Sequence, residues 1–140
     1  MIDLLDELTS YLASNTGLTP GVSAFYNEMP DEPAKCIVIQ EERHGVSIPV
    51  QIDAEIHSIK ITARDSSASG SKSLAESCRR WLITDLETYD EDKTVDTTGF
   101  ITLPNKAVVH VRLYSSPVWE KADQHGRKYF CFYASIITPR

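Results

Sequence analysis

Long hydrophobic runs and a basic leader are both missing from this sequence. No segment is long and apolar enough to span a bilayer, and the first residues are acidic and amphipathic, unlike those of a signal peptide. Cysteine is scarce as well. The three cysteines, Cys36, Cys78 and Cys131, are odd in number and lie far apart in the sequence. This usage argues against a disulfide framework and predicts buried thiols in a reducing compartment.

Positive charge is also in short supply. The chain has 14 lysines and arginines against 20 aspartates and glutamates, which gives a net charge of −6 and a pI near 5.1. Because the basic residues are scattered, a general nucleic-acid-binding surface is disfavoured. The remaining composition, 41% hydrophobic and 24% charged, is ordinary for a soluble globular protein. A length of 140 residues predicts a single domain spanning residues 1–140.

Motifs for catalysis or ligand binding are absent too. The four histidines, His44, His57, His110 and His125, show no metal-ligand spacing, and there is no Cys-x-x-Cys. No serine lies in a Gly-x-Ser-x-Gly elbow, and the segment 69–73 lacks the spacing of a phosphate-binding loop. We therefore predict that the protein is not an enzyme, with no catalytic residues, metal or cofactor.

Two amphipathic helices are predicted. The first covers residues 3–15, where leucines and a tyrosine recur at three- and four-residue steps, and Gly17 is a left-handed cap after it. The second begins at Ser73, which heads a capping box with Glu76. Its predicted buried stripe is Leu74, Cys78, Trp81 and Leu82, with Leu86 as a further candidate. The small polar residues 65–71 predict a mobile loop, and the acidic residues 85–96 predict a solvated connection.

Strands are predicted from alternating or continuous apolar runs. A short strand at residues 22–26 is followed by an acidic turn bracketed by Pro30 and Pro33, and then by a strand at residues 36–41. Residues 50–64 alternate strictly, but the phase of the alternation flips near His57 and Ser58. This flip predicts a bulge, or else two ends that bury opposite faces. A hairpin between the strand at 36–41 and the long strand is the simplest pairing.

The C-terminal third predicts a second antiparallel hairpin. Residues 100–103 suggest a short strand, residues 107–116 alternate, and the aromatic-rich residues 128–137 form their partner strand. The segment 117–126 is predicted to be a projecting loop. Trp119 at its start has two interpretations: it covers the end of the sheet, or it anchors a protein partner.

These elements together predict an α+β fold. The order is helix, three strands, helix and two strands, with both helices packed on one face of a mainly antiparallel sheet and a projecting hairpin or loops.

Several of these segments resemble the tail terminator proteins of long-tailed bacteriophages, which are also described as minor capsid proteins. The resemblance begins with the N-terminal helix ending at residues 15–18, the proline-bracketed turn and the strand from Cys36. It continues through residues 59–64, the small-residue loop and the helix ending in Trp81 and Leu82. It ends with residues 115–119 and the Asp123-x-x-Gly126-Arg127 pattern before the aromatic strand.

The resemblance implies a structural role in the virion. Such proteins form rings, usually of six copies, that cap the finished tail tube, stop its growth and dock to the head-side connector. The implied partners are further copies of the chain, the tail tube protein and the connector or stopper protein, with DNA passing through the lumen without specific binding. The implied location is the tail–head interface, after assembly in the host cytoplasm.

Residues 117–126 and residues 43–49 are the candidate contact regions for these partners, because an aromatic side chain and charges lie there beside strong strands. The candidate interface residues are Arg43, His44, Val46, Ile48, Ile52, Trp119, Lys121, Asp123 and Arg127. The half-strand at residues 50–56 is expected to pack on a neighbouring subunit or to form a projecting hairpin. Two alternatives remain open: another head–tail neck protein, or a small enzyme or ligand-binding domain with a pocket under the helices.

Overall fold

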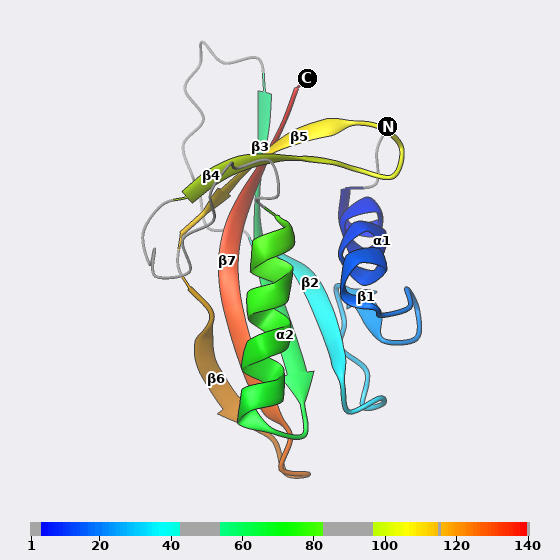
Figure 1. Cartoon of the computed structure of the whole chain (residues 1–140), viewed down its shortest axis with the longest axis vertical. Helices are drawn as coiled ribbons and strands as arrows, with labels where there is room; N and C mark the ends of the chain where they lie inside the picture. The colour runs from blue at the N-terminus through cyan, green and yellow to red at the C-terminus, as the bar shows by residue number, and fades with distance from the viewer. Residues whose placement is uncertain (1–3, 43–53, 83–96, 115, 140) are drawn as a thin grey trace.

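The computed structural model describes residues 4–42, 54–82, 97–114 and 116–139, which form two helices and a seven-stranded sheet (Figure 1). The elements in chain order are α1 (Leu4–Thr16), β1 (Ala24–Tyr26), β2 (Cys36–Glu42), β3 (Ala54–Asp65), α2 (Ala68–Trp81), β4 (Thr97–Thr102), β5 (Val108–Leu113), β6 (Val118–Ala122) and β7 (Lys128–Pro139). The strand order is β1-β2-β3-β7-β5-β4, and β6 also pairs with β7. Among these pairs β1–β2 is parallel and the rest are antiparallel, so the predicted α+β class is confirmed.

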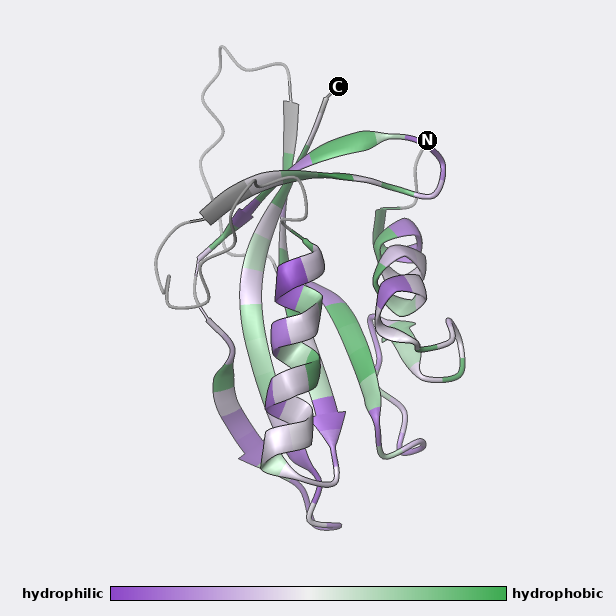
Figure 2. Ribbon diagram, in the orientation of Figure 1, coloured by the Kyte–Doolittle hydropathy of each residue, from purple (hydrophilic) through white to green (hydrophobic). Residues whose placement is uncertain are grey.

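Both helices pack on the same face of the sheet. In Figure 1, α2 lies in front of β3 and β7, and α1 lies beside β1 and β2. The predicted stripe of α1 is confirmed. Leu8 and Leu12 are fully buried, and the other members, Leu4, Leu5 and Tyr11, pack against the core. Figure 2 shows hydrophobic residues along most of β2, which α1 covers. Gly17 ends α1 with a φ of 77°, the left-handed conformation expected of a cap.

The pairing of β3 with β7 is the longest in the sheet and runs without interruption. Its register passes from Ala54↔Pro139 to Asp65↔Lys128 with no shift. Of the two outcomes that the phase flip predicts, the bulge at His57 and Ser58 is therefore wrong, and the alternative of two ends that face opposite sides of the sheet holds for residues 54–65. Because alternate residues of a continuous strand point to opposite faces, Ile56 faces away from the helices whereas Ile59 lies in the core beneath them. Residues 50–53 lie outside the described residues.

Helix α2 begins earlier than predicted. Ser67 is the N-cap, and its Oγ accepts a hydrogen bond from Gly70 N at 3.0 Å. Ser71 is fully buried and donates to the carbonyl of Ala68, so the small residues let this first turn lie close to the sheet. Most of the predicted mobile loop, residues 65–71, is therefore the first turn of α2. Ser73, the predicted start of the helix, lies inside α2. The predicted connection at residues 85–96 lies outside the described residues.

Arg64 near the end of β3 fixes the proline-bracketed turn. Its side chain is 2% exposed and donates to the backbone carbonyls of Pro30, Pro33 and Ala34 at 2.8, 2.6 and 3.2 Å. A guanidinium with five donors can satisfy several carbonyls that no strand partner reaches. Arg64 thereby ties the turn before β2 to the central pair of strands.

Neither α1 nor α2 has the length and apolar character needed to cross a membrane.

Candidate functional site

The predicted loop at residues 117–126 contains a strand. β6 pairs with β7 from Val118↔Cys131 to Ala122↔Lys128, and the register shifts between Trp119 and Lys121. The prediction of a loop over this whole segment is therefore wrong. The bulge explains the error, because it breaks the two-residue period that identifies a strand in sequence. The projecting part is the short turn at residues 123–126.

Trp119 is half covered by the sheet and half exposed to solvent. Its ring makes an edge-to-face contact with Phe130, with centroids 5.7 Å apart and planes at 81°. Phe130 in turn packs against the hydrophobic core, whereas 51% of the Trp119 surface remains accessible. The ring is thus held in place by the protein while one side stays available. An indole that is positioned before binding loses little rotamer freedom on contact with a partner.

The bulged part of β6 is tied to the sheet by charged groups. The Lys60 ammonium on β3 forms an ion pair with the Glu120 carboxylate. Burial alone would lower the pKa of Lys60, but the hydrogen bond and charge of Glu120 outweigh it and raise that pKa. Beside this pair, Lys121 Nζ lies 4.8 Å from the centroid of the Tyr129 ring. The Lys121 side chain is exposed to solvent, although its ammonium lies over the Tyr129 ring.

The turn between β6 and β7 is built on Asp123. Its carboxylate accepts hydrogen bonds from the backbone N–H of His125 at 2.9 Å and from the hydroxyl of Tyr129 at 3.0 Å. The Arg127 backbone N–H and Nε donate to it at 3.0 and 2.7 Å. Burial raises the pKa of Asp123, but these four hydrogen bonds outweigh it and hold the pKa well below its ordinary value.

Arg127 lies inside this network and not on the surface. Its side chain is 7% exposed, and its guanidinium also donates to the backbone carbonyl and the carboxylate of Asp31. The network borders a shallow cleft of about 400 Å³, which Arg64 and His125 also line. Arg64 and Arg127 both donate to groups of the proline-bracketed turn, so their hydrogen bonds join the hairpin and β3 to that turn at this cleft.

A second exposed apolar region lies on the face of the sheet opposite the helices. The register places Phe100, His110 and Ile137 side by side on this face, and the Phe100 and His110 rings stack with centroids 4.7 Å apart. Among the residues that the structure describes, the large exposed apolar side chains of this face are Phe100 (49%), Val108 (55%), Val118 (48%) and Tyr133 (41%). We call these four residues the open-face cluster. The sequence alone did not predict this cluster, although the alternation in β5 and β7 does place Val108 and Tyr133 opposite the buried residues.

The predicted interface residues fall into two groups. Trp119, Lys121, Asp123 and Arg127 come together on the β6–β7 hairpin. Arg43, His44, Val46, Ile48 and Ile52 lie outside the described residues. Contact of either group with a partner stays a prediction.

The histidines on the strands are not a pair. His57 lies on the helix-side face beside Glu41, with Nδ1 and Oε1 3.7 Å apart, whereas His110 lies on the opposite face. Among the residues that the structure describes, no group of three or more histidine, cysteine or acidic side chains is placed to hold a metal ion. A comparison with models of known protein families finds no match, and a comparison with curated proteins likewise finds none.

Proposed function

We propose that this chain is a tail terminator protein of a long-tailed bacteriophage, which assembles into a ring, usually of six copies, on the end of the tail tube. The proposal starts from the sequence resemblance. The observation that carries it further is the position of the exposed apolar side chains, which lie on the open face of the sheet and on the β6–β7 hairpin. Side chains of this size placed at a surface are characteristic of protein contact sites.

The geometry supports contacts on two sides of one subunit. Trp119 lies on the face of the sheet that carries the helices, whereas the open-face cluster lies on the other. Two different surfaces allow a head-to-tail contact between copies, and such contacts close into rings when the rotation between copies permits. Under this proposal, the hairpin of one subunit packs against the open face of the next subunit.

The acidic charge supports the same role. Six copies at −6 each carry about −36, which disfavours binding of the DNA backbone during its passage through the ring. A lumen that repelled phosphate would let the genome move without adhering. The tube end and the connector would then be the binding partners, with the chain making no specific contact with DNA.

The deciding experiment is tube capping. Purified protein is added to tail-tube subunits from the same phage, and tube lengths are measured by electron microscopy. We expect growth to stop at added protein, with a ring visible at one tube end and a mass that is a multiple of the 15.7 kDa chain. Unchanged tube growth would reject the tail terminator role. Binding to the connector without capping would assign the chain to another neck protein.

The hairpin assignment is tested separately with Trp119→Ala. We expect the variant to fold but to lose ring formation, since central aromatic contacts commonly carry about 2 kcal/mol or more of binding energy. The matched control is Val22→Ala, which removes an exposed apolar side chain away from both surfaces. If Trp119→Ala assembled and capped tubes as well as the control did, the hairpin would not be the contact region.

A further inference from the structure

Three of the strands that the structure describes pair with a neighbour on one side only. They are β1 and β4 at the two ends of the strand order, and β6 on its branch beside β7 (Figure 1). Backbone N–H and C=O groups along such an edge can pair with a strand of another chain, and proteins usually prevent this with charges, proline, bulges or covering segments. The three edges differ in how well they are protected.

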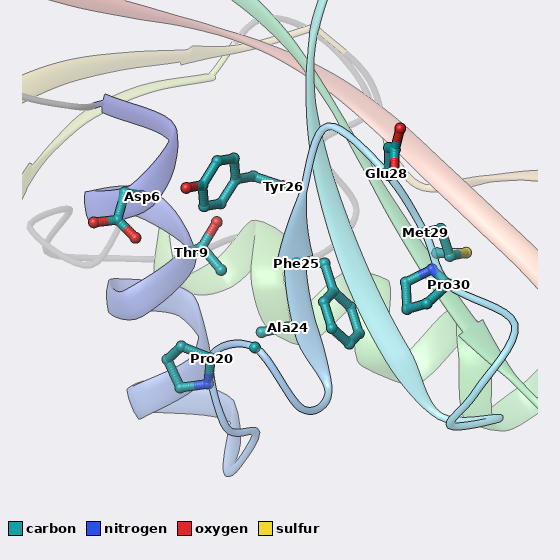
Figure 3. Close-up of a pocket in the computed structure, with 10 residues that line it drawn as sticks. Asp6, Thr9, Pro20, Ala24, Phe25, Tyr26, Glu28, Met29 and Pro30 are labelled. Carbon is teal, nitrogen blue, oxygen red and sulfur yellow. The ribbon is translucent and has the colours of Figure 1, made fainter.

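The edge of β1 is covered by its own chain. The loop before β1 returns to this strand, and Ala24 N–H donates to Thr19 O at 3.2 Å. Figure 3 shows Pro20 of this loop close to Ala24, at a cleft of about 560 Å³ beside α1 and β1. Further along the same edge, Tyr26 O accepts a hydrogen bond from Glu28 N at 2.9 Å. Little backbone on this side therefore remains for another strand.

The edge of β6 is protected by a bulge and by charge. The register of β6 with β7 shifts between Trp119 and Lys121, so the strand is irregular there. Glu120 and Lys121 also place two charges among its five residues. Both features hinder pairing with a further strand.

The edge of β4 has none of these protections. Its residues, Thr97–Thr102, include no charged residue and no proline, and all six pair with β5 without a shift of register. Within the part of the chain that the structure describes, β4 makes its main contacts with β5. A regular, uncharged edge strand of this length is a template for pairing with another chain.

The outer edge of β4 presents the backbone of every second residue. Leu103 N–H donates to Ala107 O at 2.8 Å, in the same register as the β4–β5 pair. Successive residues of an antiparallel strand direct their N–H and C=O groups to alternate sides, so the even-numbered residues of β4 face outward. These residues are Thr98, Phe100 and Thr102. Among the residues that the structure describes, none hydrogen-bonds to the outward backbone groups of Phe100 or Thr102.

We propose that β4 pairs with β4 of a second copy of the chain, antiparallel and with the two Phe100 residues opposite each other. In this register the backbone groups of Phe100 meet each other, and those of Thr98 meet those of Thr102, so every outward residue has an outward partner. The Phe100 ring is 49% exposed and stacks on His110 within its own chain. The second Phe100 ring would lie beside it on the same face, and aromatic pairs across strands are stabilising.

A second copy suits this edge because β4 is complementary to itself. A two-fold axis through the Phe100 pair places Gly99, which has no side chain, opposite the large side chain of Ile101 on the other face of the sheet. The pair also brings no like charges together along the strand, although each copy carries a net charge of −6. The proposal does not rest on the tail terminator role. Because the pair covers Phe100 of the open-face cluster, it is a state of the free chain and not of the ring.

The first test is the mass of the purified full-length chain, without tube subunits, by sedimentation equilibrium. A single short strand pair is a small interface, so we expect reversible dimerisation with a dissociation constant on the order of 0.1 mM. The mass should rise with concentration from 15.7 kDa toward twice that value and no further, because a two-fold pair leaves no β4 edge open.

Amide hydrogen exchange locates the contact. The N–H groups of Phe100 and Thr102 should exchange more slowly at high than at low chain concentration, because pairing gives them hydrogen-bond partners. The N–H of Ile101 faces β5 and should be protected at both concentrations, which also shows that β4 itself is intact.

Charged variants test the register. Phe100→Lys places like charges opposite each other and should weaken dimerisation at least about tenfold. The matched control is Val108→Lys, which adds the same charge to the open face at a 55% exposed position on β5, and its dimerisation should stay within about twofold of the parent. A mixture of Phe100→Lys and Phe100→Glu should form a mixed dimer at least about tenfold tighter than either variant forms alone.

Several results would overturn the proposal. They are a chain that stays monomeric up to about 1 mM, equal weakening by the two lysine variants, and a mixture no tighter than its components. Slower exchange of β6 amides in place of those of β4 would assign the contact to the hairpin and would also overturn the pair. A six-copy species without slower exchange at Phe100 and Thr102 would favour the ring and reject the pair. Tube capping plays no part in these measurements, so failure of the pair and failure of the tail terminator role are separate results.

Discussion

The carboxylate of Asp123 accepts two hydrogen bonds from Arg127, one from the backbone N–H at 3.0 Å and one from Nε at 2.7 Å. Arg127 also donates to Asp31, so one guanidinium joins the tip of the β6–β7 hairpin to the turn before β2. Trp119 lies on the same hairpin. Hydrogen bonds made within the subunit therefore anchor the hairpin that carries the proposed contact residue.

The Asp123 network should make stability depend on pH. The pKa of Asp123 is depressed in the folded chain, because its hydrogen bonds outweigh burial, whereas an unfolded aspartate has a pKa of about 3.9. The stabilisation is therefore complete above roughly pH 4 and is lost as pH falls toward the folded value. Asp123→Asn should lower the free energy of unfolding at neutral pH and flatten its decline in acid. Urea unfolding of both proteins across this range provides the measurement, with Glu32→Gln as a control for removing an acid. Parallel pH profiles for parent and Asp123→Asn would contradict the assignment.

Arg64 should be among the most sensitive positions in the chain. Arg64→Ala leaves the carbonyls of the proline-bracketed turn without their buried donor, which predicts a loss of about 3 kcal/mol or more in the free energy of unfolding. Arg64→Lys keeps the charge but not the fork of donors, so we expect an intermediate loss. Lys72→Ala, at an exposed position on α2, should stay within about 0.5 kcal/mol of the parent. A loss no greater than that of Lys72→Ala would mean that the turn does not need Arg64.

The start of α2 can be tested with two serines. Ser67→Ala removes the N-cap side chain and should cost about 1 kcal/mol, measured by urea unfolding. Ser73→Ala changes an exposed residue inside the helix, where alanine is the better helix former, and should be neutral or slightly stabilising. A larger loss of stability for Ser73→Ala than for Ser67→Ala would instead support the capping box at Ser73 that the sequence alone predicts.

The thiols should be inert in the folded protein. Cys36, Cys78 and Cys131 form no disulfide and are buried, and burial raises the pKa of Cys78 to about 12. Because the thiolate is the reactive form, a disulfide reagent at about pH 8 should label the native chain very slowly and should label all three thiols after unfolding. Rapid labelling of one thiol per native chain would show that one of these side chains is reachable.

The periodic elements were predicted well because their neighbours agree with their local pattern. The leucine stripe of α1 faces the sheet as its spacing requires, and the β2–β3 and β5–β7 pairings are confirmed. Prediction failed where local signals were ambiguous. Five serines between residues 66 and 73 offer competing caps, and in the folded chain Ser71 is buried while Ser67 accepts the capping hydrogen bond from Gly70 N. In β6, the bulge at Glu120 hides the strand period, and the ion pair with Lys60, 60 residues away, is not visible in the sequence.

The sequence by itself determined the α+β class, the acidic charge, the buried thiols and the faces of the helices, because these depend on composition and on periods of two and 3.6 residues. The tertiary structure decided which residues are exposed together. Pairing of β4, β5, β6 and β7 places the open-face cluster on one side and holds Trp119 on the other. It also brings Asp31 and Arg127 together across 96 positions. Such contacts join distant segments whose spacing carries no local signal, so only the folded chain defines the surfaces that a partner would meet.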